Sequence, residues 1–360
     1  MSSATIATPQ IDGAKLHDFM LKAVGDMGAS MHGVLILLGD RLGLYKAMAD
    51  SKPITSTELA SRTKTSERYI REWLNANAAS GYVTYDPATK SYTLPPEQAV
   101  VLAMEHGPAF LPGAFEIVLS CFNDVDKIEE AFRTGKGVGW HEHHHALYHG
   151  VERFFRPGYL MNLTTNWIPA LTGVEQKLRD GAKVADIGCG LGASTILMAK
   201  AFPNSEFYGF DYHDASIAMA REAAKREGIG DRLHFEVASA KNYPGKDYDF
   251  VAFFDCLHDM GDPKGAAAYV HSTMKPDGTW MIVEPYAEDA TEGNLNPVGR
   301  VFYTASTMIC VPASLSQEVG AALGAQAGEK RIGEVVTAGG FKNFHRATQT
   351  PFNLVYEARA

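Results

Sequence analysis

The segment that most constrains this 360-residue chain is a short apolar stretch that runs into three glycines at alternate positions, from Val184 to Gly192. The pattern predicts a buried strand and a tight turn, because glycine lets the backbone bend sharply and lets a ligand approach the main chain. A helix-forming stretch over 193–201 follows, and a second apolar segment then ends in Asp211. A carboxylate at that strand end can accept hydrogen bonds from ribose hydroxyls. The segment therefore predicts a site for a nucleoside-containing cofactor.

Two cofactor classes fit this segment. The first two glycines and Ala193 satisfy the G-x-G-x-x-A form of the dinucleotide fingerprint, which would indicate a nicotinamide enzyme. However, an acidic residue inside the strand end and the spacing G-x-G-x-G resemble motif I of the class I S-adenosylmethionine (SAM) dependent methyltransferases. In that family the loop approaches the methionine and sugar parts of SAM. The residues that this resemblance assigns to the loop are Asp186, Gly188, Gly190 and Gly192.

The order of the later segments favours the methyltransferase interpretation. Residues 250–255 read as a strand with apolar residues on both faces, and a proline-glycine turn separates a helix from the next strand, 279–284. Two final strand-like segments, 341–348 and 352–358, are separated by three residues, so we expect them to pair antiparallel. The resemblance implies an α/β fold: a Rossmann-like class I methyltransferase domain with a seven-stranded, mostly parallel sheet that ends in an antiparallel hairpin.

The N-terminal part resembles a winged helix-turn-helix domain. Thr55 and Ser66 are placed to cap two helices, and a strand, a turn and a strand follow over 82–94. The whole chain then resembles class I methyltransferases with a winged-helix domain, such as the Rv2258c-like methyltransferases, and is similar in plan to small-molecule O-methyltransferases. The resemblance implies a helical and winged-helix dimerisation domain over 1–105, a helical linker and active-site lid over 106–170, and a SAM-binding methyltransferase domain over 171–360.

The charges of the winged-helix segment argue against nucleic acid as a partner. Between Arg41 and Glu97 there are eight basic and six acidic residues, which leaves a balance of only +2 without a basic stripe. Phosphate contacts normally supply most of the affinity for DNA. We therefore expect this domain to form a homodimer, and a SAM-responsive DNA-binding regulator remains the alternative.

Bulk composition indicates a cytoplasmic protein. The net charge of −9 gives no general attraction to nucleic acid or anionic lipid, and the first ten residues lack the pattern of a signal peptide. The longest strongly apolar run, Val34–Leu38, is far shorter than the ~20 residues that span a bilayer, so no membrane association is expected. Four scattered cysteines predict free thiols in a reducing compartment: Cys121, Cys189, Cys256 and Cys310.

A second group of chemically capable residues follows the strand that ends at Asp255. Ligands of parallel α/β sheets lie at the carboxyl ends of strands, and His258-Asp259-Met260 comes just beyond this one. The segment resembles the His-Asp-Trp of plant O-methyltransferases, whose histidine is the general base, and Glu284 corresponds to the glutamate that orients it. The resemblance implies catalytic roles for His258, Glu284 and Asp259; the alternative is that His258 only caps a helix or packs.

These residues suggest a chemistry. Methyl transfer from SAM is an in-line displacement at an activated carbon, so the protein must mainly align the reactants and exclude water. A hydroxyl is a poor nucleophile until its proton leaves, and a histidine with a pKa of ~6.5 suits that task. We predict a SAM-dependent methyltransferase that O-methylates a small organic acceptor. N- or C-methylation, for which His258 would matter less, is the alternative.

The remaining cofactor residues are assigned by position. Tyr212, next to Asp211, is placed to cover a face of adenine. The resembled family usually has Gly-Asp at the adenine amino group, whereas this chain has Ala238-Ser239, whose hydroxyl can still form a hydrogen bond. The expected cofactor contacts beyond the glycine loop are Asp211, Tyr212, Ser239 and Asp255.

Two further segments are expected to shape the acceptor pocket. Histidines at positions 141, 145 and 149 would share one face of a helix, which could form a substrate lid, a metal site or a solvated surface. Since no ordered set of cysteines or acids completes a metal site, no metal is predicted. The segment 295–315, inserted after the last parallel strand, should cap the pocket. The expected substrate contacts are His141, His145, Tyr303 and Met308.

Overall fold

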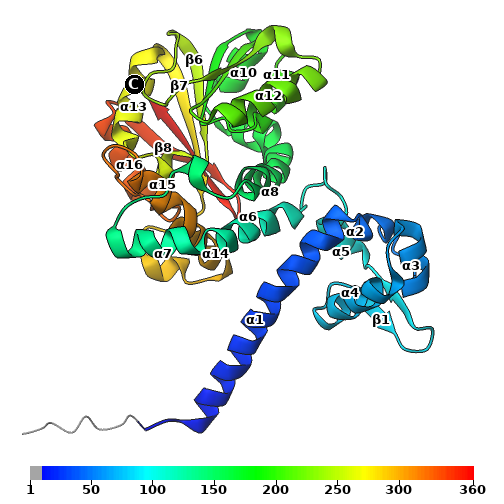
Figure 1. Ribbon diagram of the computed structural model, residues 1–360. Helices are drawn as coiled ribbons and strands as arrows, with labels where there is room; N and C mark the ends of the chain where they lie inside the picture. Colours follow the sequence, from blue (N-terminus) through cyan, green and yellow to red (C-terminus); the bar gives the residue numbers. More distant parts are fainter. Residues whose placement is uncertain (1–9) are drawn as a thin grey trace, which may run out of the picture. The chain divides into compact units, whose positions relative to one another are not determined.

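The computed structural model describes residues 10–360, and the chain divides into two compact units, one up to Phe115 and one from Glu116 onward (Figure 1). The segment 106–170, expected to be a separate linker and lid, is not a third unit, because its residues from Glu116 onward belong to the second. The elements of the first unit are α1 (Gly13–Arg41), α2 (Leu44–Ala47), α3 (Ser56–Thr63), α4 (Glu67–Ala79), β1 (Thr84–Asp86), β2 (Ser91–Thr93) and α5 (Pro96–Leu102).

The first unit has the winged-helix plan. Thr55 caps α3 through a capping box: its hydroxyl accepts from the Glu58 backbone N–H at 3.3 Å, and its own N–H donates to the Glu58 carboxylate at 2.8 Å. Ser66 is the N-cap residue of α4 but makes no side-chain capping bond there. The antiparallel pair β1–β2 forms the wing. Tyr45 and Trp73 are buried between the helices and bring α2 and α4 into one core.

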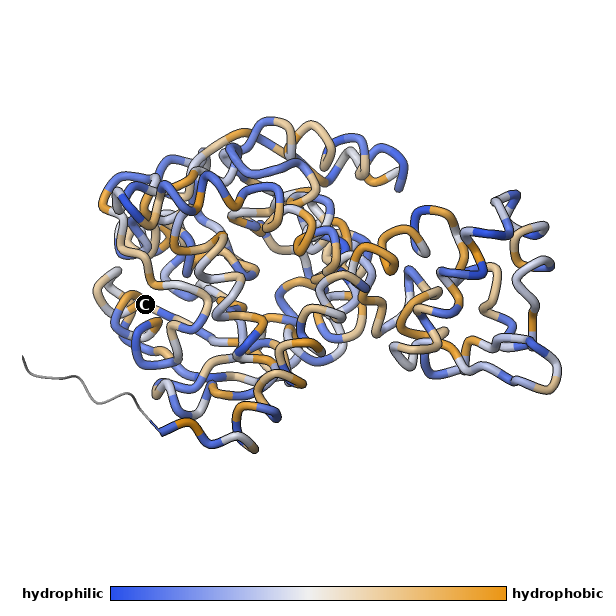
Figure 2. The backbone as a smooth tube through the Cα atoms, turned by 60° about the horizontal axis from the view of Figure 1, so that its bottom comes forward, coloured by the Kyte–Doolittle hydropathy of each residue, from blue (hydrophilic) through white to orange (hydrophobic). Residues whose placement is uncertain are grey.

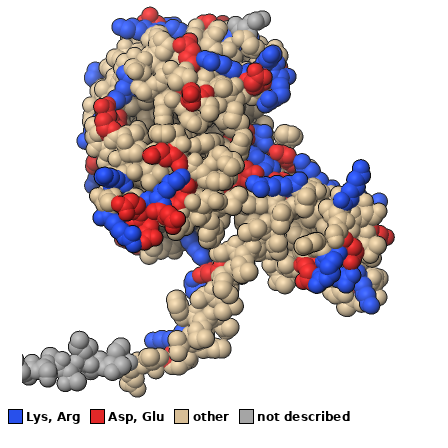
Figure 3. All heavy atoms as spheres, in the orientation of Figure 1, with Lys and Arg blue, Asp and Glu red and all other residues tan. Residues whose placement is uncertain are grey.

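The N-terminal segment forms one 29-residue helix, α1. Hydrophobic and hydrophilic residues alternate along it, and few charged atoms lie on the face shown in Figure 3 (Figures 2 and 3). By length and composition alone, α1 could cross a membrane. The expectation of no membrane association considered only uninterrupted apolar runs, and α1 by itself does not decide it, because helices of soluble proteins pass the same test. Its exposed large apolar residues include Leu16, Phe19, Met20, Val24, Met27 and Met31.

The second unit is an α/β domain whose helices pack on both faces of one sheet (Figure 1). The helices that precede or flank the sheet are α6 (Pro112–Asn123), α7 (Val125–Thr134), α8 (Ala146–Asn162), α9 (Ile168–Ala170), α10 (Val174–Asp180), α11 (Ala193–Ala201), α12 (Asp214–Arg226), α13 (Pro263–Thr273), α14 (Pro297–Ala305), α15 (Val311–Leu315) and α16 (Gly328–Ala338). The strands are β3 (Lys183–Ile187), β4 (Glu206–Asp211), β5 (Leu233–Val237), β6 (Tyr248–Phe254), β7 (Met274–Pro285), β8 (Asn343–Gln349) and β9 (Asn353–Arg359).

The sheet confirms the fold expected from the sequence. Its seven strands run in the order β5-β4-β3-β6-β7-β9-β8, and β9 runs antiparallel to both of its neighbours, β7 and β8, whereas the other pairs are parallel. β4 and β5 extend the sheet on one side of β3, and the later strands extend it on the other side, beginning with β6. The direction in which successive strands are added therefore reverses between β3 and β6. Ligands of such sheets bind at this switch point, outside the carboxyl ends of the strands.

The strands are buried because apolar residues cover both of their faces. Val184, Phe250 and Met281 belong to the core on one face of the sheet, and Ile187, Phe253 and Ile282 belong to the core on the other. One boundary differs from the sequence expectation: α13 ends at Thr273, and the proline-glycine segment lies at the start of β7, where the register with β6 is irregular. The functional strand end, at Glu284, is unaffected by this shift.

Candidate active site

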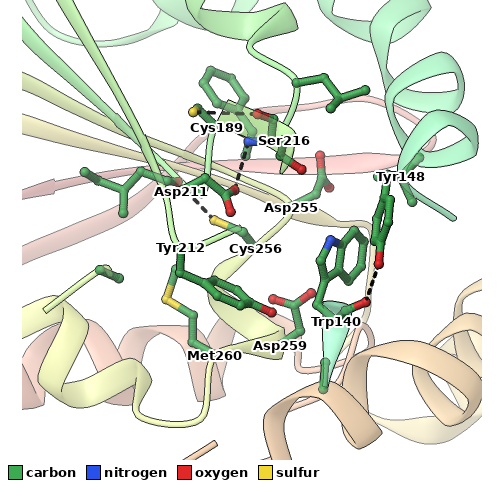
Figure 4. A pocket seen from close by; sticks show the side chains of 18 of the residues that line it. Trp140, Tyr148, Cys189, Asp211, Tyr212, Ser216, Asp255, Cys256, Asp259 and Met260 are labelled. Atoms are coloured by element: carbon green, nitrogen blue, oxygen red, sulfur yellow. Dashed lines mark hydrogen bonds between the residues drawn. The ribbon is translucent and has the colours of Figure 1, made fainter. Parts of the chain in front are cut away.

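A cavity of about 480 Å³ opens at the carboxyl ends of β3, β4 and β6 (Figure 4). It is lined on one side by the glycine loop after β3 and by residues that follow β4 and β6. On the other side it is lined by α8 and by the short helical turn Trp140–Glu142. The cavity therefore lies at the switch point where the topology places a ligand.

The glycine loop is shaped by backbone conformation. Gly190 has a φ of 52°, lines the cavity and has no atom within 4 Å of where a Cβ would stand, so its backbone is open to a ligand. Gly192 does not line the cavity; with a φ of 80°, its Cβ would stand 2.5 Å from the Phe235 ring, so glycine is required there for packing. Gly188 lines the cavity as expected.

Asp186 is hydrogen-bonded to residues just after the glycine loop and does not line the cavity. Its Oδ2 accepts hydrogen bonds from the hydroxyls of Ser194 and Thr195, each at 2.7 Å, and the residue is fully buried. Burial raises the pKa of Asp186 to about 7. The carboxyl group thus ties the end of β3 to the first turn of α11, and it does not line the cavity where a cofactor contact was expected.

Asp211 ends β4 with its carboxylate held in place. One oxygen accepts from the Gly190 backbone N–H at 3.0 Å, and the other accepts from the His213 N–H at 2.8 Å. Burial raises the pKa of this carboxyl group. Tyr212 and Ser239 also line the cavity, so the structure brings together the residues expected to surround ribose and adenine.

His258 and Glu284 form a buried pair at the ends of β6 and β7. The ring Nδ1 lies 2.6 Å from Glu284 Oε2, while the other carboxylate oxygen accepts from the Leu257 N–H at 3.1 Å. Burial lowers the pKa of His258, but the charge of Glu284 and hydrogen bonds to Cys310 and Glu284 outweigh it, so that the pKa stands well above its usual value. His258 is only 3% exposed and does not line the cavity, whereas its neighbour Asp259 does.

Asp255 and Asp259 both point into the cavity (Figure 4). Asp255 accepts hydrogen bonds from the Tyr159 hydroxyl at 3.2 Å and from the Asn353 amide at 2.9 Å. Burial raises the pKa of Asp259 to about 7. The two carboxyl groups therefore differ: Asp255 accepts hydrogen bonds from the fold, and Asp259 faces the cavity without a hydrogen-bond donor from another described residue.

One cluster has the atoms of a metal site. The ligand atoms of His258, Asp259 and Cys310 lie within 4.8 Å of one another. Metals bind the thiolate form of cysteine, and burial raises the pKa of the Cys310 thiol, which opposes that form. The histidines at 141, 145 and 149 do not complete such a cluster within residues 10–360.

The acceptor side of the cavity differs from the sequence expectation. His141 and His145 are exposed and do not line the cavity; Trp140 and Tyr148 of the same segment do. The reason is that α8 starts only at Ala146, so the histidines do not share a helical face. Spacing along α8 was the missed signal: its cavity-lining residues recur at helical intervals, at Tyr148, Val151, Glu152, Phe155 and Tyr159.

The inserted segment after β7 contributes other residues than expected. Tyr303 and Met308 do not line the cavity, and Met308 packs instead against an apolar cluster that includes Leu147 and Phe302. Ala313 and Gln317, one to two turns further along the chain, reach the cavity. The insertion covers the pocket from its far end, because its first helix is used to hold α8.

The turn at Trp140 is fastened over the cavity by two residues that follow Asp211. The Trp140 backbone interacts with the Tyr212 hydroxyl and partly offsets the rise in its pKa that burial causes, and the Tyr148 hydroxyl donates to the Trp140 carbonyl at 3.2 Å. The rings of Tyr148 and His213 are 4.7 Å apart. We call the segment 138–148 the lid. Its N-terminal end is also fixed, since the Val138 N–H donates to the Pro312 carbonyl at 3.0 Å.

This fold and cavity define a class I methyltransferase architecture, and comparison with known proteins agrees. Human N-acetylserotonin methyltransferase in complex with SAM superimposes with a TM-score of 0.71 at 14% identity, covering 98% of this chain and 99% of that one. Mitomycin 7-O-methyltransferase gives a TM-score of 0.67 at 18% identity, covering 97% and 100%. At these identities the likeness establishes the fold alone.

Sequence comparison gives the family. Residues 30–104 match the Rv2258c-like winged HTH domain, and residues 178–334 match a methyltransferase domain. The 27-O-demethylrifamycin SV methyltransferase of Amycolatopsis mediterranei is 29% identical over 49% of this chain and 66% of its own length. The chain spans 26%, 33% and 66% of the length of three curated relatives that it matches. The chain thus carries an Rv2258c-like winged HTH domain followed by a methyltransferase domain.

The residues at the cavity fit SAM. Gly190 leaves its backbone open, Asp211 presents fixed oxygens at the strand end, and Tyr212 presents a half-exposed ring beside it. The expectation of SAM in place of a nicotinamide dinucleotide is confirmed by the methyltransferase match.

Proposed function

We propose that this protein transfers the methyl group of SAM to a hydroxyl of a small organic acceptor, with His258 as the general base. The observation that carries the proposal is the contact of 2.6 Å between His258 Nδ1 and Glu284, next to a residue that lines the cavity. Bound SAM supplies a methyl group already activated by its sulfonium. The chain itself must then hold the reactants in line, exclude water and accept one proton.

The His258–Glu284 contact supports the base role through its effect on the tautomer. An Nδ1–H that donates to Glu284 leaves Nε2 with a lone pair, which is the atom that accepts the proton. The Cys310 Sγ lies within 4.8 Å of a nitrogen of the same ring. The acceptor hydroxyl would replace the thiol at Nε2, give up its proton there and attack the methyl carbon. Glu284 would stabilise the resulting imidazolium.

The raised pKa of His258 sets the pH dependence of this step. A histidine must be neutral to act as a base, and a raised pKa means that a larger fraction is protonated at neutral pH. Turnover should therefore increase as the pH rises toward the alkaline side. A bell-shaped or falling profile over the same range would contradict the assignment.

The test of the proposed function is a turnover screen with SAM. Phenols, catechols and hydroxyacids would be offered as acceptors, and S-adenosylhomocysteine (SAH) and the methylated product would be identified by mass spectrometry. Methylation on oxygen is the expected result. Methylation of nitrogen or carbon, in acceptors that offer all three, would replace O-methylation by the alternative and remove the need for His258 as a base.

For the first unit we propose dimerisation in the cytoplasm, with no nucleic acid and no membrane as partner. Its support is α1, whose apolar side chains are exposed: Phe19 is 67% and Met31 is 68% accessible. Such faces are normally covered by another protein surface. Charged residues such as Lys15, Asp18 and the ion pair Lys22–Asp26 also lie on α1 and disfavour a bilayer.

Two measurements test this assignment. Light scattering should give a dimer at micromolar concentration, and removal of residues 1–95 should give a monomer. A mobility-shift assay at low and moderate salt should show no DNA binding. A monomeric full chain, a dimeric truncated chain or salt-resistant binding to DNA would each contradict the proposal, the last in favour of a SAM-responsive regulator.

A further inference from the structure

The side of the cavity formed by the lid and α8 has an aromatic surface. Trp140 and Tyr148 lie 5.9 Å apart between ring centroids, and Phe155, Tyr159 and Phe254 continue the surface, with centroids 5.2 to 6.2 Å apart. Aromatic rings attract flat apolar molecules, and their faces attract cations. Anions gain nothing from such faces. The surface therefore favours an aromatic acceptor and disfavours a negatively charged one.

The ionisable residues of the cavity add to this preference. Five acids line it, and Lys241 is the one basic side chain among the described lining residues. Lys241 is already paired with Asp262 at 3.0 Å and with Glu318. No cationic side chain thus remains to neutralise an anionic acceptor within the described lining. The lining acids are Glu152, Asp211, Asp255, Asp259 and Glu318.

Four of the five acids have a partner that accounts for them. Glu318 is paired with Lys241, and Glu152 lies 3.5 Å from Arg156. Asp211 is held by two backbone N–H groups at the proposed ribose site, and Asp255 accepts from Tyr159 and Asn353.

Asp259 is the exception. Its carboxylate has no hydrogen-bond donor from another residue in the described part of the chain, although a ring nitrogen of His258 lies within 4.8 Å of it and the charge of His258 lowers its pKa against the larger effect of burial. It points into the cavity between Tyr212 and Trp140 (Figure 4). It directly follows His258, the proposed base, and belongs to the same helical turn, Leu257–Asp259. Burying a carboxylate that has no hydrogen-bond donor costs free energy, unless a ligand supplies a donor or a positive charge.

We infer that the acceptor is an aromatic compound with a positively charged or hydrogen-bond-donating group that meets Asp259, and that anionic acceptors are excluded. This inference rests on the proposed function, because it concerns the acceptor of the same cavity.

The direct test measures binding without turnover. The full-length protein, saturated with SAH, would be titrated by calorimetry with benzyltrimethylammonium, benzyl alcohol and benzoate, which differ mainly in charge. We expect the cation to bind about tenfold or more tightly than benzoate, the scale of one desolvated cation contact, with the alcohol between them.

Two matched variants assign the preference to Asp259. Asp259→Asn keeps the size of the side chain and removes its charge, so most of the preference for the cation should disappear. Asp180→Asn makes the same change at an exposed residue of α10, at the opposite end of β3, and should leave the preference unchanged. Calorimetry with SAM must show that Asp259→Asn still binds the cofactor, because a loss of SAM affinity would assign Asp259 to the cofactor and overturn the inference.

Turnover separates this inference from the proposed function. With 4-hydroxybenzylamine, 4-hydroxybenzyl alcohol and 4-hydroxybenzoate as acceptors, kcat/KM should decrease in that order. Benzoate binding as tightly as the cation, no binding of any probe at millimolar concentration, or a preference that survives in Asp259→Asn would each overturn the inference. Selective binding of the cation without methylation of any phenol would sustain the inference and contradict O-methylation.

Discussion

The cofactor side and the acceptor side of the cavity are built by different kinds of structure. The cofactor side consists of strand ends and the loop between β3 and α11, where backbone N–H groups and buried carboxylates fix one another, as between Gly190 and Asp211. The acceptor side consists of the lid, α8 and the end of the inserted segment, where aromatic side chains are in contact. The cofactor, which is the same in all such enzymes, is contacted by a rigid backbone loop. The acceptor, which differs among them, is contacted by side chains that can be replaced without changing the fold.

The comparison can be broken most clearly at His258, the proposed base for the acceptor. His258→Ala should reduce turnover by about 10²- to 10⁴-fold, the usual contribution of a general base, and should leave SAM affinity nearly intact. The loss should shrink at high pH, where a phenolic acceptor ionises unaided. The measurement is kcat with an identified acceptor, beside calorimetry with SAM.

Glu284→Gln is the graded companion of that variant. It should cost less than His258→Ala, because the base remains and only its orientation and charge stabilisation are lost. Turnover of His258→Ala at the wild-type rate near neutral pH would show that the protein works by alignment alone.

Asp211 isolates the cofactor side. Asp211→Ala should weaken SAM binding by about 10- to 100-fold, because the ribose hydroxyls lose a charged acceptor. Asp211→Asn, which keeps one acceptor oxygen for the Gly190 N–H, should weaken it less. Calorimetry gives both affinities. Affinity equal to wild type in Asp211→Ala would remove the ribose assignment.

Trp140 isolates the acceptor side. Trp140→Ala should raise the acceptor KM by about tenfold through the loss of one aromatic face, and it should change SAM affinity much less. His141→Ala is its neighbour control: that side chain is exposed and outside the lining, so both constants should stay at wild-type values. Steady-state kinetics with both substrates varied would show a reversed pattern if His141, and not Trp140, contacted the acceptor.

The smallest expected effect sharpens the comparison through pH. Asp259 has a pKa raised to about 7 by burial, so its carboxyl group is mostly neutral at about pH 6 and mostly ionised at about pH 8. Binding of benzyltrimethylammonium in the presence of SAH should therefore tighten several-fold as the pH rises through that range. His258, Glu284, Asp211, Cys310 and Tyr212 also interact with this region.

The control for this effect is Asp259→Asn, whose affinity for the cation should stay flat over the same range. A slope that persists in the variant would assign the titration to His258 or another of those groups. The preference for the cation itself is tested separately, by the titrations with the three probes at one pH.

The cofactor side could be predicted from the sequence because glycine spacing and strand-end acids are local signals. Gly188, Gly190, Asp211 and Tyr212 all line the cavity as expected. Even there, Asp186 and Gly192 were assigned to the ligand although they support the loop, since a motif does not distinguish contact from support.

The acceptor side could not be predicted in the same way. Whether His141 or Trp140 faces inward depends on where α8 begins and on which helix packs against it, and neither follows from local pattern. The displacement of Tyr303 and Met308 from the cavity has the same cause, since their turns pack with α8 in place of lining the pocket. Burial of His258 beneath Cys310 was likewise a property of packing.

The attachment of the lid has a consequence for the order of events in turnover. Tyr212 and His213, which hold Trp140 and Tyr148, directly follow Asp211 in the chain. The proposed ribose-binding residue, Asp211, and the residues that contact the lid, Tyr212 and His213, are therefore consecutive in the chain. A nucleoside that enters first would set both before the acceptor arrives, and SAH would have to wait for the lid to unfasten. The methylated product should then dissociate before SAH, and accumulating SAH should inhibit the enzyme by keeping the lid closed.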